Sequence, residues 1–146
     1  MDDRREGVVQ DHLIAVVGIA GVVLFALYLL TLGGGAIIYP ETTKRFLGGF
    51  ATSQRTHFTE LALRVVAGAS LVSSAPRMAF GQGIALFGWM LVVTSLALAM
   101  IPWRLHHRFA AWAVPQATQH MTLVGIVSIV GGLAVLAALL LPRTIG

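Results

Sequence analysis

A stretch of twenty residues without a charge, 13–32, constrains this chain more than any other feature. As a helix it would rise about 30 Å, which is the thickness of the hydrocarbon core of a bilayer. The uncharged run continues to Pro40, so the helix can span a membrane with some tilt. It is longer than the apolar part of a secretory signal and lacks an Ala-x-Ala cleavage site, so we expect a retained first span.

Three further apolar runs repeat this chemistry, at 61–75, 84–101 and 122–141. With 57% hydrophobic and 11% charged residues and a mean hydropathy of +0.84, the chain is outside the range of soluble domains. We therefore predict one all-α integral membrane domain over residues 1–146, with four transmembrane helices. In a membrane protein, a net charge of +4 indicates an interaction with lipid headgroups and a role in topology, not binding of nucleic acid. The absence of cysteine excludes disulfides and thiolate sites.

Both longer connectors have the pattern of a short amphipathic helix at the membrane interface. In the first, Phe46, Leu47 and Phe50 share a helical face; a solvated basic loop is the alternative there. In the second, Leu105 and Trp112 share a face with Phe109 between them. Tryptophan and basic side chains hold such helices among the headgroups. The expected membrane-interface anchors are Lys44, Arg45, Trp103, Arg104, Arg108 and Trp112.

The two halves of the chain match at an offset of 63 residues, which aligns Thr31 with Thr94, for example, and Gly68 with Gly131. Each half reads as a span, a proline, a basic and aromatic connector and a second span. We predict a tandem repeat of residues 12–75 and 80–141. Because each half crosses the membrane twice, both start on the same side, which implies symmetry about an axis along the membrane normal.

A resemblance adds to this reading. The segment from Arg64 to Leu105 contains a span with Gly68, a short turn, a span with Gly88 and Trp89, and an exit rich in proline and arginine. In this it resembles a loose group of small uncharacterised bacterial inner-membrane proteins with four spans. The resemblance implies a location in a bacterial inner membrane. It implies no activity and no functional residues.

Two constellations of polar residues carry candidate chemistry. The repeat aligns His57 with His120 at the starts of two helices of the same direction, where facing imidazoles could bind a haem iron; interfacial histidines bonded to headgroups are the simpler alternative. Glu60 and Arg64 are spaced by one helical turn and can form an ion pair or an ion or proton site. If the second helix starts near Phe58, Arg64 lies about 7–10 Å inside it and can snorkel.

Small residues are the most abundant functional signal. Helix association in lipid relies on close packing, and glycine, alanine and serine permit it. We expect packing or partner-binding faces at Ala67, Gly68, Ser70, Ser74, Gly131 and Gly132. The spans carry serines without a neighbouring base and no metal-binding cluster, so we expect no enzyme and no cofactor other than the haem considered above.

These patterns favour a non-catalytic accessory subunit that packs against other chains of a larger complex, such as a respiratory or photosynthetic assembly. A small homo-oligomeric transporter or channel is the alternative, and a b-type haem protein is a third. For orientation, the side of the two connectors carries five Lys and Arg residues and the side of the termini carries four. The cations of the first side lie close to helix ends, so we expect cytoplasmic connectors and termini on the non-cytoplasmic side.

Overall fold

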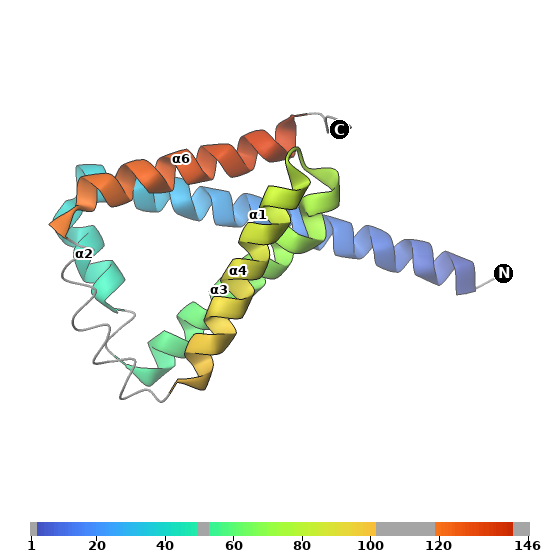
Figure 1. Ribbon diagram of the computed structural model, residues 1–146, viewed down its shortest axis with the longest axis horizontal. Helices are drawn as coiled ribbons and strands as arrows, with labels where there is room; N and C mark the ends of the chain where they lie inside the picture. The colour runs from blue at the N-terminus through green and yellow to red at the C-terminus, as the bar shows by residue number, and fades with distance from the viewer. Residues whose placement is uncertain (1–2, 50–52, 102–118, 142–146) are drawn as a thin grey trace.

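The computed structural model describes residues 3–49, 53–101 and 119–141, with side chains from Glu6 onward. Within them the chain is all-α and forms five α-helices, to which the short 3₁₀ helix η1 (Ala75–Arg77) is added (Figure 1). The α-helices are α1 (Asp3–Ile38), α2 (Pro40–Gly49), α3 (Gln54–Ser74), α4 (Gly81–Met100) and α6 (Met121–Leu140). All but α2 are long and apolar enough to cross a membrane, as the sequence predicts.

Helix α1 is longer than expected. Its 36 residues correspond to about 54 Å. The charged segment before Leu13 is part of the helix from Asp3 onward. The three glycines from Gly33 to Gly35 do not interrupt it either. Gly33 instead meets α6, where a Cβ would lie 2.7 Å from the carbonyl oxygen of Gly125. The helix ends at Ile38, two residues before Pro40 begins α2.

The spans associate as two antiparallel pairs, α1 with α6 and α3 with α4. Each pair has a point where two backbones nearly touch. In the second pair a Cβ on Gly68 would lie 2.6 Å from the carbonyl oxygen of Gly88. In the first pair a Cβ on Gly132 would lie 3.0 Å from the carbonyl oxygen of Ala26. Glycine is required at such contacts because any side chain would separate the helices.

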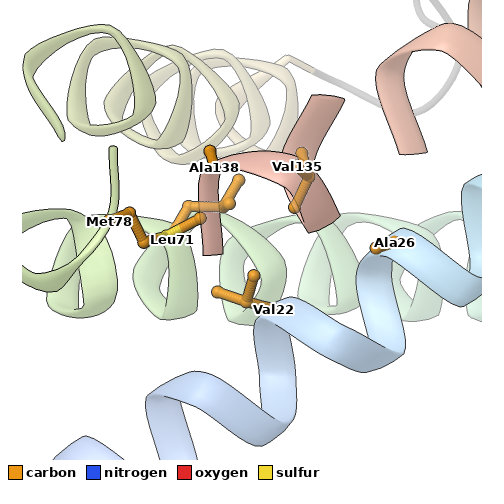
Figure 2. Close-up of a cluster of buried hydrophobic side chains, with 6 residues drawn as sticks. All are labelled: Val22, Ala26, Leu71, Met78, Val135 and Ala138. Carbon is orange, nitrogen blue, oxygen red and sulfur yellow. The ribbon is translucent and has the colours of Figure 1, made fainter. Parts of the chain in front are cut away.

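The two pairs cross obliquely and meet near one end, where α1 packs on α3 (Figure 1). Side chains from α1, α3, the turn after η1 and α6 form the buried cluster drawn in Figure 2. Its members are Val22, Ala26, Leu71, Met78, Val135 and Ala138. The turn is also tied to α6, because the amide of Ala79 donates a hydrogen bond of 2.7 Å to the carbonyl of Ala138.

The start of α1 and the end of α6 lie towards the same end of the molecule (Figure 1). Gly18 of α1 lies against Ser73 and Ser74 at the end of α3, and α6 ends beside the turn after η1 (Figure 1). The N-terminal part of α1 projects past these contacts. Four antiparallel spans thus place the first residues of α1, the α3–α4 turn and the end of α6 on one side, and α2 on the other.

Helix α4 is the least covered of the four spans. It packs on α3 and η1 but not extensively on α6. Only Gly88 and Ser95 are buried along it. The four long helices therefore do not close into a bundle in which every helix has two neighbours.

Candidate functional site

The most polar contact inside the spans joins Glu60 and Arg64 of α3. The Arg64 guanidinium donates a hydrogen bond to the Glu60 carboxylate, with Nη2 and Oε1 2.5 Å apart. Both side chains are partly exposed, Arg64 more than Glu60. The spacing of Glu60 and Arg64 in the sequence indicates this contact.

This pair lies deeper in its helix than the sequence indicates. Helix α3 begins at Gln54, a turn before Phe58, because Ser53 and Thr56 form a capping box that bonds the first amides. Arg64 is consequently the central residue of α3, ten residues from either end. About 15 Å of helix lies on each side of it. The earlier expectation of a charge 7–10 Å inside the helix is therefore wrong.

The histidines have unlike surroundings. His57 is buried near the start of α3, and its ring centroid lies 5.6 Å from that of Phe58. His120 is exposed at the N-cap of α6. The starts of these two helices are apart in Figure 1, so the structure does not bring the imidazoles together. Among the described residues no group of three or more His, Asp or Glu side chains could hold a metal.

The small residues of α3 serve packing within the chain. Gly68 meets Gly88 of α4, while Ser70 lies against Gly21 of α1 and Ser74 against Gly18. Gly132 is likewise buried against α1. The other two members of the predicted set, Ala67 and Gly131, are half-buried. The faces at these positions are therefore largely occupied by helices of the same chain.

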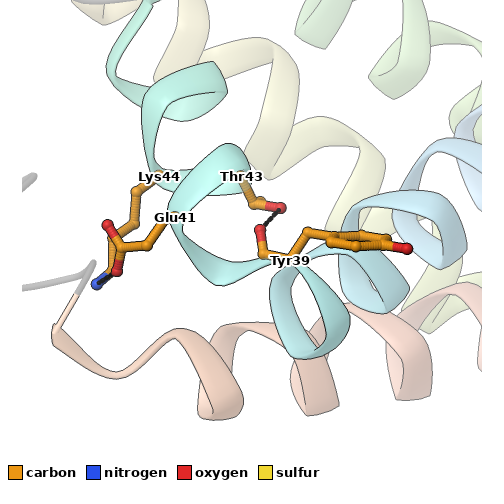
Figure 3. Close-up of polar contacts among 4 residues, drawn as sticks. All are labelled: Tyr39, Glu41, Thr43 and Lys44. Atoms are coloured by element: carbon orange, nitrogen blue, oxygen red, sulfur yellow. Dashed lines mark hydrogen bonds and ion pairs between the residues drawn. The ribbon is translucent and has the colours of Figure 1, made fainter.

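Helix α2 lies away from the start of α1 and the end of α6 (Figure 1), and its charged groups include Glu41 and Lys44 (Figure 3). Lys44 Nζ lies 2.7 Å from Glu41 Oε1, and this ammonium lowers the pKa of the Glu41 carboxyl. Thr43 is buried and donates a hydrogen bond to the carbonyl of Tyr39, the residue between α1 and α2. Arg45 is exposed. The other expected anchors, Trp103, Arg104, Arg108 and Trp112, lie outside the described residues, as does the second predicted amphipathic helix.

Comparison with known proteins adds no assignment, since no protein family, curated protein or solved structure matches this chain.

Proposed function

We propose that this chain is a non-catalytic accessory subunit of a larger complex in a bacterial inner membrane, such as a respiratory or photosynthetic assembly. The supporting observation is the open arrangement of the spans, in which α4 has extensive contacts on one side only. Helices in lipid associate where packing is close, and an unclosed set of four leaves room for a helix of another chain.

The free face of α4 has the spacing of a helix-packing seam. Large apolar side chains recur on it at intervals of three and four residues, as at the a and d positions of a heptad. Each is more than half exposed in the isolated chain. They are Leu86, Trp89, Val93, Leu96 and Met100. Because the small residues of α3 and α6 are used internally, we assign the partner-binding face to α4 in place of residues 67–74.

The test is the mass of the assembly extracted from native membranes in a mild detergent. Removing Trp89 and Leu96 together, as Trp89→Ala with Leu96→Ala, should release the 15.5 kDa chain from its complex. The matched control replaces Leu24 and Leu27 on the exposed face of α1 with alanine. Both proteins should keep the wild-type unfolding temperature. A wild-type protein that runs as a monomer, or a complex that survives the α4 changes, contradicts the proposal.

A small homo-oligomeric transporter is the second candidate, and the ion pair of Glu60 and Arg64 within α3 favours it. Ionisable residues within a membrane-spanning helix are costly and commonly mark ion or proton pathways. The measurement is proton flux into proteoliposomes that contain a pH-sensitive dye. A transporter loses this flux in Glu60→Gln and keeps it in Glu41→Gln, which changes a carboxylate on α2. Absence of flux in the wild type removes this candidate.

The tandem repeat of residues 12–75 and 80–141 is also proposed, with two short helices at the interface. The offset of 63 aligns α1 with α4 and α3 with α6. The pair of α3 and α4 in the structure is therefore the counterpart of the pair of α6 and α1, and these are the two most extensive helix pairs. Gly68 then corresponds to Gly131, and Gly88 corresponds to Phe25. The close contact of Gly68 with Gly88 therefore has its counterpart one residue away, where Gly132 meets Ala26. The symmetry is broken where α1 packs on α3, since α4 has no comparable contact with α6.

A further inference from the structure

A groove of about 430 Å³ runs between the projecting part of α1 and the arginine of η1. One face of α1 supplies most of its lining, since the residues recur at the intervals of neighbouring helical turns. The lining residues are Val8, Asp11, His12, Ala15, Val16, Ile19 and Arg77. The groove therefore combines an apolar wall with two opposite charges.

These charges are available to a ligand. The described residues form two ion pairs, Lys44 with Glu41 and Arg64 with Glu60, and neither includes a residue of the groove. Arg77 Nη1 donates a hydrogen bond of 3.3 Å to the carbonyl of Ser73, which orients the guanidinium and leaves its other donors. Asp11 and Arg77 line the same groove without being within ion-pair distance of each other.

The groove lies at the boundary between polar and apolar chain. The apolar run of α1 begins at Leu13, so Asp11 is on the polar side of the boundary and Val16 and Ile19 are on the apolar side. Contacts of Gly18 with Ser73 and Ser74 bring the α3–α4 turn to this level. A ligand that matches the groove has a positive and a negative group at one end and an apolar remainder.

We propose that the groove binds a zwitterionic phospholipid, phosphatidylethanolamine. The phosphate accepts hydrogen bonds from Arg77, and the primary ammonium donates to the Asp11 carboxylate. An acyl chain continues along Val16 and Ile19 into the bilayer. A choline headgroup has no N–H to donate, and a glycerol headgroup brings no positive charge to Asp11. Both should therefore bind more weakly than ethanolamine.

The experiment is native mass spectrometry of the delipidated full chain in mild detergent, with added phosphatidylethanolamine, phosphatidylglycerol or phosphatidylcholine. We expect each chain to retain one phosphatidylethanolamine tightly. The ratio of lipid-bound to lipid-free protein should be about tenfold higher for this lipid than for the other two, because it gains one charge-assisted hydrogen bond. Asp11→Asn should remove the preference. Arg77→Gln should weaken retention of all three lipids, and Arg77→Lys should restore much of it.

Two matched changes of charge outside the groove serve as controls, Glu6→Gln on α1 and Arg55→Gln at the start of α3. Both side chains are exposed and should leave retention unchanged. Equal retention of the three lipids by the wild type would overturn the proposal. So would Asp11→Asn and Arg77→Gln proteins that are folded, as judged by their unfolding temperature, and retain lipid as the controls do.

Discussion

At the scale of single residues, two neighbouring glycines of α1 have opposite roles. A Cβ on Gly33 would lie 2.6 Å from Cγ1 of Ile129 and 2.7 Å from the carbonyl oxygen of Gly125, whereas a Cβ on Gly34 would meet nothing within 4 Å. We expect Gly33→Ala to lower the free energy of unfolding by about 1–3 kcal/mol, since a backbone oxygen cannot move aside cheaply.

Gly34→Ala is the matched control and should be neutral or stabilising by up to about 1 kcal/mol, because alanine favours helix. The measurement is the thermal unfolding midpoint of both variants in the same detergent. Equal midpoints would mean that α1 and α6 are not in contact at Gly33.

A second residue-scale prediction concerns Glu41. The bond from Lys44 favours the ionised carboxylate and so lowers its pKa, with a smaller contribution from Arg45. Lys44→Gln should therefore raise the pKa of Glu41, and Arg45→Gln should raise it less. Any stabilisation by this pair is present above the ordinary pKa of a glutamate and is lost as pH falls through the lowered value. Carboxyl-carbon NMR titration measures the pKa, and an unchanged value in Lys44→Gln would contradict the ion pair.

At the scale of elements, the α3–α4 turn depends on a glycine. A Cβ on Gly81 would lie against the carbonyl oxygen of Ala75, while a Cβ on Gly83 would meet open space. Phe80 before it already adopts a left-handed conformation, with φ 54°. We expect Gly81→Ala to lower the unfolding midpoint clearly and Gly83→Ala to leave it nearly unchanged. Equal effects of the two substitutions would mean that the turn has another conformation.

The sequence predicts the number, type and approximate place of the spans, because apolar length is a local property. The all-α class and the presence of four helices long and apolar enough to cross a membrane are accordingly confirmed, and a helix, α2, lies in the first connector. Three features were not predicted. They are the continuation of α1 through its glycines, the earlier start of α3 and the use of Gly68 against Gly88 within the chain. The first and third depend on contacts between helices, and the second depends on the local capping box of Ser53 and Thr56.

At the candidate site, too, local contacts follow from the sequence, whereas positions set by the rest of the structure do not. The spacing of Glu60 and Arg64 indicates their contact, since residues four apart are neighbours on any helix. Their depth does not follow from spacing, because it depends on the capping box at Ser53 and Thr56. Nor did the alignment of His57 with His120 in the sequence translate into proximity.

At the scale of the whole molecule, the two helix pairs are in contact at one end and separate at the other. The buried cluster, the tie from Ala79 to Ala138 and the lipid groove all lie towards the termini. Towards α2 the two helix pairs are apart (Figure 1). An accessory subunit with this form would be stable at its tied end and would receive a partner along α4. The transporter candidate would instead use the region around Arg64.

This arrangement gives a final prediction on sidedness. The α3–α4 turn shares its side with both termini, and α3 begins on the side of α2. Because the side of α2 and the second connector carries five Lys and Arg residues against four, with its cations close to helix ends, it should face the cytoplasm. The chain has no cysteine, so single cysteines report without background. In intact cells an impermeant maleimide should label Gln82→Cys and not Gln54→Cys, and permeabilised cells should show both labelled. Labelling of Gln54→Cys alone in intact cells would show that the orientation is opposite to the expected one. Labelling of both variants would contradict four antiparallel spans.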